Sequence, residues 1–263
     1  MRNFLDIIVG FLSKITNFKL DNYFVHRYSD ALSLKVAEKL DFQVVYGPFK
    51  GMKLNPKSYW TRHIIANVAL GSYETDVQLE LQHLKTEFNR NIFIDIGGAD
   101  GLYAIGVLVN NMFNKTVVFE IEEYGRKAIK NNAIYNQVED RIIILEEANK
   151  KMLKKTITEY PDSIILMDIE SMEFQLLDIE MINLIKNVPI IIEIHCFSES
   201  DKIKYQELKA NLNVLFDLKV INNTKKELDS HKHIFHLTDL QKALILTERR
   251  DISAEWLVCR PKV

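Results

Sequence analysis

Four polar side chains stand at the ends of two apolar runs, and their spacing could support catalysis or metal binding. Asp168 and Glu170 close one run, and Glu193 and His195 close the next. Successive side chains of a strand alternate between its faces, so each pair is predicted to share one face. If the two strands are neighbours, all four groups converge. Burying three carboxylates together requires a proton or a cation among them.

Three interpretations of this group stay open. Asp168, Glu170, Glu193 and His195 could bind a divalent cation, because carboxylates and imidazole suit Mg, Mn or Zn. Such a metal would orient and acidify an acceptor hydroxyl. Alternatively, His195 or Glu193 is a general base that acts without a metal. In the third interpretation Asp168 contacts a cofactor, and the other residues only satisfy hydrogen bonds at the strand ends.

A glycine-rich turn lies earlier in the chain and is predicted to bind a nucleotide. The run NIFIDIGGADG contains Gly97, Gly98 and Gly101 together with Asp95 and Asp100. Glycine permits a tight turn and a close ligand, and the helix that follows points amide donors at the loop. A dinucleotide turn has the spacing G-x-G-x-x-G, which leaves room for a pyrophosphate. Here the carboxylates would repel a pyrophosphate and would suit the ammonium of a methionine moiety.

Two further residues are placed near this turn by the sequence. Glu120 ends the next predicted strand, about 20 residues on, where an acid can accept both ribose hydroxyls. Tyr103 follows the turn and is predicted to border the cofactor. The ordered set of Asp95, Gly97, Gly101 and Glu120 favours a cofactor site over a plain tight turn with an incidental glutamate.

The elements that must position these residues alternate between strand and helix. Apolar runs predict strands at 92–96, 116–121, 141–145, 163–169 and 189–195. The pattern between the last two predicts one long amphipathic helix over 173–187. Such runs, separated by helical patterns, indicate βαβ units on a parallel sheet that is covered on both faces.

The remaining C-terminal segments complete the expected sheet. They predict a helix near 200–212, a strand at 214–221, a helix at 237–248 and a last strand at 255–260. About seven strands in this order indicate an α/β fold. We expect a Rossmann-like, doubly wound sheet that is mostly parallel with one antiparallel strand.

The N-terminal part is predicted to be an appendage of this domain. Residues 1–40 have helical spacing, and a short hairpin is expected at 42–54. An amphipathic helix is predicted over 73–88. We therefore divide the chain into 1–72, a lid or dimer contact, and 73–263, the Rossmann-like domain.

The composition of the chain limits the binding partners and the location that we expect for it. The chain has 263 residues, 47% hydrophobic and 27% charged, with a formal net charge of -2. This balance gives no broad electrostatic footprint for nucleic acid, so no nucleic-acid partner is expected. Two distant cysteines, Cys196 and Cys259, favour a reducing, cytoplasmic location. The apolar N-terminal run is too short to span a bilayer, so no membrane partner is expected, and a homo-oligomer is left open.

Several sequence blocks resemble a known family. FIDIGGADGLYA, VVFEI, IILMDIESMEFQLLD and IIIEIH are similar to successive blocks of class I S-adenosylmethionine-dependent methyltransferases, closest to the FkbM-like branch. The resemblance implies that Asp95 and the backbone near Gly97 hold the methionine end of the cofactor. It also implies that Glu120 binds the ribose and that Ile121 covers one face of the adenine.

The resemblance has further implications for the site and the reaction. Glu147 and Ala148 fall where the adenine edge is usually read, and Ser171 stands where the fourth block, D-x-E-G, usually has glycine. This branch implies O-methylation of a hydroxyl on a small-molecule or glycan acceptor, such as a sugar or natural product. The blocks are much less specific for the acceptor than for the cofactor.

Two other classes of protein stay open. An NAD-dependent oxidoreductase is disfavoured because the G-x-G-x-x-G spacing is missing. A non-catalytic cofactor-binding or scaffold protein would be expected to have a degraded acidic cluster, whereas the cluster here is intact.

Overall fold

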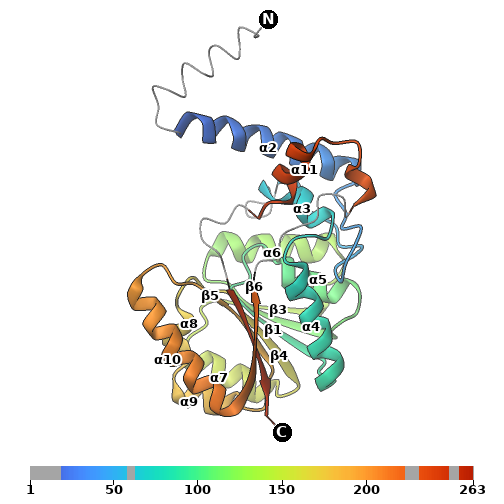
Figure 1. Cartoon of the computed structure of the whole chain (residues 1–263). Coiled ribbons are helices and arrows are strands. Elements are labelled where there is room, and N and C mark those ends of the chain that lie inside the picture. Colours follow the sequence, from blue (N-terminus) through green and yellow to red (C-terminus); the bar gives the residue numbers. More distant parts are fainter. Residues whose placement is uncertain (1–18, 58–62, 223–230, 249–254, 263) are drawn as a thin grey trace, which may run out of the picture.

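The computed structural model describes residues 19–57, 63–222, 231–248 and 255–262. Within these ranges the strands are β1 (Ile92–Ile96), β2 (Lys115–Phe119), β3 (Ile142–Leu145), β4 (Ser163–Met167), β5 (Ile190–Ile194), β6 (Phe216–Asn222) and β7 (Glu255–Pro261). They form one sheet in the order β3-β2-β1-β4-β5-β7-β6 (Figure 1). β7 runs antiparallel to both of its neighbours, β5 and β6, and the pairs among β1 to β5 are parallel. The predicted mixed α/β sheet is confirmed.

Helices cover both faces of this sheet, and further helices form the appendage beside it (Figure 1). They are α2 (Lys19–Lys39), α3 (Ile65–Ala69), α4 (Thr75–Phe88), α5 (Leu102–Val109), α6 (Glu123–Tyr135), α7 (Lys150–Glu159), α8 (Glu173–Leu176), α9 (Ile179–Leu184), α10 (Glu199–Leu215) and α11 (Asp239–Leu246). Helices α4, α5 and α6 lie on one face and α7, α9 and α10 on the other (Figure 1). Their buried side chains pack against the sheet. None of the described helices is long and apolar enough to cross a membrane.

Strand order creates a switch point beside β1. From β1 the chain proceeds outward to β2 and β3, and then returns to β4 on the other side of β1. Ile96 is level with Phe119 of β2 and Met167 of β4, so the carboxyl ends of three strands lie at one height. Ligands of open α/β sheets bind in the crevice at such a point.

The alternation of side chains along the strands decides what faces this crevice. In β5, Ile192 and Ile194 pack in the cluster beneath α9 and α10, whereas Ile191 packs in the cluster on the opposite face. Glu193 therefore shares its face with Ile191. Buried apolar residues make up most of β4 and β5, and the four polar residues Asp168, Glu170, Glu193 and His195 lie at or just after the carboxyl ends of these strands.

The predicted long helix over 173–187 is wrong, because two short helices occupy this segment. Between α8 and α9, Asp178 is extended, with φ -74° and ψ 175°, and its carboxylate accepts a hydrogen bond from the Met181 amide at 2.9 Å. Asp178 therefore begins α9 as an N-cap, a role that aspartate favours. The prediction failed because the amphipathic pattern of the sequence continues through Asp178, where the helix is interrupted.

Replacing Asp178 by alanine should lower the free energy of unfolding by about 1 kcal/mol, the usual value of an N-cap. Urea denaturation measures the change. Asp178→Asn is the matched control, because asparagine keeps the cap and removes the ion pair with Lys150. If both variants lose the same stability, the ion pair and not the cap is responsible.

The helical appendage is built from both ends of the chain. α2 and α3 pack with α11, which comes late in the sequence (Figure 1). Ser29 Oγ donates to the Leu244 carbonyl at 3.0 Å, and Asn67 Nδ2 donates to the Leu246 carbonyl at 3.0 Å. The division at residue 72 therefore leaves out α11, which lies with the N-terminal helices.

The other N-terminal predictions have mixed outcomes. The helix predicted over 1–40 is present over Lys19–Lys39, and residues 1–18 lie outside the described residues. The hairpin at 42–54 is reduced to one antiparallel bridge, between Gln43 and Lys53. The amphipathic helix predicted over 73–88 is confirmed as α4.

Candidate active site

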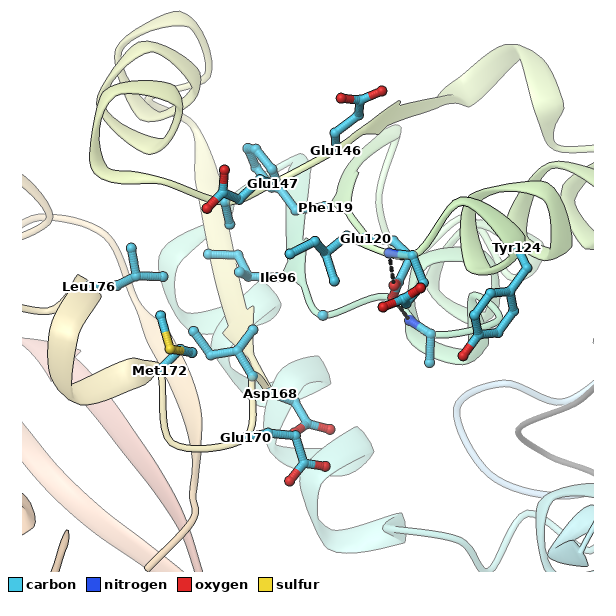
Figure 2. Close-up of a pocket in the computed structure, with 16 residues that line it drawn as sticks. Ile96, Phe119, Glu120, Tyr124, Glu146, Glu147, Asp168, Glu170, Met172 and Leu176 are labelled. Atoms are coloured by element: carbon cyan, nitrogen blue, oxygen red, sulfur yellow. Dashed lines mark hydrogen bonds between the residues drawn. The ribbon is translucent and has the colours of Figure 1, made fainter.

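A cavity of about 390 Å³ opens at the carboxyl ends of β1, β2 and β4 (Figure 2). Its walls come from the glycine turn after β1, the segments after β2 and β3, and the loop between β4 and α8. The predicted site residues that line it are Gly97, Glu120, Ile121, Glu147, Ala148, Asp168 and Glu170. The switch point of the sheet therefore holds a cavity large enough for a nucleoside.

Glu120 stands in this cavity, held by the backbone around it. One carboxylate oxygen accepts from the Ala99 amide at 2.7 Å and the other from the Glu122 amide at 2.8 Å (Figure 2). A Cβ on Gly125 would lie 2.7 Å from Glu120 Cγ, so only glycine fits there. Each carboxylate oxygen has a second lone pair, so Glu120 can still accept hydrogen bonds from two hydroxyls.

The glycine turn is packed tightly between two strands. Gly97 has φ +96°, and a Cβ there would lie 1.8 Å from the carbonyl oxygen of Asp168. A Cβ on Gly98 would lie 2.2 Å from Val118 of β2. These approaches explain the two glycines, and they join the end of β1 directly to the end of β4.

Five predicted cofactor residues do not line the cavity: Asp95, Gly98, Asp100, Gly101 and Tyr103. Asp95 is 2% exposed and faces the first turn of α5, where the Ala104 amide donates to its carboxylate. Asp100 is buried, and it lines a separate small cavity beside Asn132. The chain enters α5 at Leu102, and between Gly98 and Tyr103 only Ala99 lines the cofactor cavity.

Tyr103 instead lies on the side of the acidic residues. Its hydroxyl donates to Glu74 at 2.7 Å, and its ring packs edge-on against Phe49. Burial raises the pKa of Tyr103 well above its usual value, and the nearby Glu74 charge adds to this. The phenol therefore remains a hydrogen-bond donor beside the acids.

Burial raises the pKa of Asp95 to about 7, against the hydrogen bond from Ala104, which lowers it. The folded protein therefore holds this proton more tightly than the unfolded chain. Its stability should fall as pH rises from about 4 to 7 and level off above that. This titration changes the free energy of unfolding by up to about 4 kcal/mol between pH 4 and pH 7, and Asp95→Asn should remove that change.

Urea denaturation of Asp95→Asn and the unchanged protein, at several pH values from 4 to 8, measures that difference. Asp217→Asn, an exposed change on β6, is the control and should keep the original slope. Equal slopes in all three proteins would contradict the raised pKa of Asp95.

The second group of residues converges as the sequence predicts. His195 Nε2 lies 3.5 Å from Glu193 Oε2, 3.6 Å from Asp168 Oδ1 and 3.9 Å from Glu170 Oε2. β4 and β5 are adjacent and parallel, which brings the two strand ends together. Glu170 is the outermost member, because its side chain is 66% exposed.

Negative charge is concentrated at this point. Desolvation raises the pKa of Asp168 well above its usual range, and Glu193, Glu74 and Glu170 raise it further. Glu74 belongs to the segment before α4 and carries no site role in the sequence interpretation. Asp168 is thus the residue that the cofactor cavity and the acidic group share.

Ser171, which replaces the glycine of the related pattern, keeps the backbone shape that glycine would allow. Glu170 and Ser171 have φ +51° and +73°, in the left-handed region. The Ser171 hydroxyl donates to the carbonyl of His195 at 2.8 Å. This hydrogen bond ties the loop after β4 to the end of β5 and offsets part of the backbone strain.

Glu173 is a site residue that the sequence interpretation missed. It is 0% exposed, and its Oε1 accepts from the His195 amide at 2.9 Å and lies 3.8 Å from His195 Nδ1. Burial raises the pKa of Glu173. The only available signal was an acid inside an otherwise apolar helix face.

Comparisons with known proteins concern the fold. No model of a known protein family and no curated protein matches this sequence. Similar solved structures include the O-methyltransferase from Bacillus cereus in complex with S-adenosylhomocysteine (11% identity, TM-score 0.44, covering 69% of this chain and 79% of that chain). They also include the M1A22 tRNA methyltransferase from B. subtilis (12%, 0.44, 69% and 65%) and the ribosomal protein L11 methylase from Lactobacillus delbrueckii subsp. bulgaricus (12%, 0.43, 70% and 79%). The function proposed below rests on the geometry of the site itself.

Proposed function

We propose that this protein is an S-adenosylmethionine-dependent methyltransferase. One observation carries the proposal: every charged residue among those that line the switch-point cavity is an acid, namely Glu120, Glu122, Glu146, Glu147, Asp168 and Glu170. A cavity lined by carboxylates favours a cationic cofactor and repels the pyrophosphate of a dinucleotide. The sulfonium cofactor is cationic and has no phosphate.

The cavity also suggests how this cofactor lies. Glu120 would receive the ribose hydroxyls, with the adenine between Ile121 and the segment Glu147–Ala148. The methionine end would then extend along Gly97 toward Asp168, because Gly97 touches the backbone of Asp168. This orientation puts the sulfonium methyl beside the group formed by Asp168, Glu193 and His195.

The chemistry needs little from the protein beyond placement. The sulfonium activates its own methyl group, so the protein positions the two reactants and excludes water. The cofactor would supply the methyl group to an acceptor hydroxyl, and the group formed by Asp168, Glu193 and His195 would receive the proton of that hydroxyl. A group that can receive a hydroxyl proton, together with the FkbM-like sequence blocks, favours O-methylation of a sugar, glycan or natural product.

A calorimetric titration with S-adenosylhomocysteine and with NAD tests the cofactor. We expect one S-adenosylhomocysteine per chain and no heat from NAD. Binding of NAD alone would overturn the proposal in favour of the oxidoreductase alternative.

The acceptor needs a separate experiment. Methyl-tritiated S-adenosylmethionine is offered with monosaccharides, oligosaccharides, sugar nucleotides and, as a contrasting arm, transfer RNA. Label on a sugar hydroxyl supports the proposal, and label on the RNA alone contradicts the sugar or glycan acceptor. Cofactor binding with no transfer to any acceptor would favour the scaffold alternative.

We also propose a cytoplasmic location. Cys196 and Cys259 are both free thiols in this structure, as a reducing compartment would keep them.

A further inference from the structure

His195 occupies an unusual position for a buried polar side chain. Its side chain is 9% exposed, and Nδ1 has no hydrogen-bond partner. Nε2 points at Glu193 Oε2 and Asp168 Oδ1, at 3.5 and 3.6 Å. A hydrogen bond needs about 2.7–3.2 Å, so these atoms are too far apart to bond directly.

The same distances fit atoms that share a central ion. Two ligands about 2.1 Å from a cation lie about 3.0 Å apart at a right angle and about 3.4 Å apart in a tetrahedron. One ligand atom from each of Asp168, Glu193 and His195 can be chosen so that all lie within 4.8 Å of one another. A small inward movement of the three side chains would close the site around an ion.

A second feature lies on the far side of the imidazole. Glu173 is 0% exposed, its Oε2 has no partner, and its Oε1 lies 3.8 Å from His195 Nδ1. Metal-binding histidines usually donate their other ring N–H to a carboxylate, which holds the free nitrogen toward the metal. Glu173 is placed to do this for His195.

From this geometry we propose that Asp168, Glu193 and His195 bind a divalent transition-metal cation, with Glu173 as the positioning residue of His195. One imidazole and two carboxylates suit Mn²⁺ or Zn²⁺ better than Mg²⁺ or Ca²⁺. Glu170, the exposed fourth member of the group, is outside the ligand set. The inference rests on the proposed methyl transfer, in which such a cation would supply Lewis acidity to an acceptor hydroxyl.

Electron paramagnetic resonance of Mn²⁺ tests the proposal without an acceptor. The full-length protein is freed of metal with EDTA and titrated, and the signal of free Mn²⁺ reports binding. We expect one Mn²⁺ per chain. His195→Gln and Asp168→Asn should abolish this binding, and Glu173→Gln should weaken it by about 10- to 100-fold.

Glu199→Gln removes an exposed acid on α10 and should leave Mn²⁺ affinity unchanged. A thermal melt checks that each variant folds, and if His195→Gln does not fold, Asp168→Asn decides the result. Two outcomes would overturn the proposal: no binding of Mn²⁺ or Zn²⁺ to the unchanged protein, or binding by both ligand variants as tight as that of the unchanged protein.

The outcome for the cation is separable from the outcome for the methyltransferase. S-adenosylhomocysteine binding is measured on the same metal-free protein. If that ligand binds and no metal does, the proposed function stands, and His195 or Glu193 acts as a metal-free base. If neither binds, both proposals fail.

Discussion

Alanine in place of Gly97 should destabilise the fold by about 3 kcal/mol and abolish binding of S-adenosylhomocysteine. Two costs add at this position. Gly97 has φ +96°, which costs a residue with a side chain about 1–3 kcal/mol. The new Cβ would also lie 1.8 Å from the Asp168 carbonyl oxygen, so β1 and β4 must separate where the cofactor is proposed to bind. Urea denaturation and calorimetry measure the two effects.

Gly51→Ala is the matched control for this variant. Gly51 has nearly the same φ, +95°, but the nearest atom to its added Cβ is Val109 Cγ1 at 3.8 Å, an ordinary contact. Gly51→Ala should therefore show only the destabilisation caused by the positive φ, and it should bind S-adenosylhomocysteine as tightly as the unchanged protein does. Equal destabilisation by the two substitutions would mean that the contact with Asp168 contributes nothing.

Glu120→Ala should weaken S-adenosylhomocysteine binding roughly 100-fold. Each hydrogen bond to a charged group contributes about 1.5–3 kcal/mol, and a factor of ten in affinity corresponds to 1.4 kcal/mol. The substitution also removes the acceptor for the Ala99 and Glu122 amides, which loosens the glycine turn. Isothermal titration calorimetry measures the affinity.

Glu123→Ala is the control, because Glu123 is an exposed neighbour that pairs with Lys127 on the surface of α6. It should bind S-adenosylhomocysteine as the unchanged protein does. A Glu120→Ala variant that binds within threefold of that control would remove the ribose role from Glu120.

The sequence predicts the sheet well because its signals are local. Buried β-branched runs identify every strand to within a few residues. The period of two correctly brings Glu193 and His195 to one face, where they meet the acids that follow β4. These inferences need only the chain near each residue and the rule that neighbouring parallel strands end together.

Other features depend on contacts that no local pattern contains. Asp178 interrupts an amphipathic run by capping α9, and Glu173 begins the short helix before it, with its side chain buried beside His195. Tyr103, in the first turn of α5, donates a hydrogen bond to Glu74, which lies 29 residues earlier in the chain. The packing of α11 on α2 joins segments that are far apart in the sequence.

The loop from Asp168 to Glu173 has a consequence for how such a protein can diversify. Its first residue touches the glycine turn, and its last two anchors, Ser171 and Glu173, hold the backbone of His195. An insertion or deletion here would displace both ends at once. In the proposed methyltransferase, a new acceptor would therefore be accommodated through the side chains that project from this segment, such as those of Glu170 and Met172, and not through a change in its length.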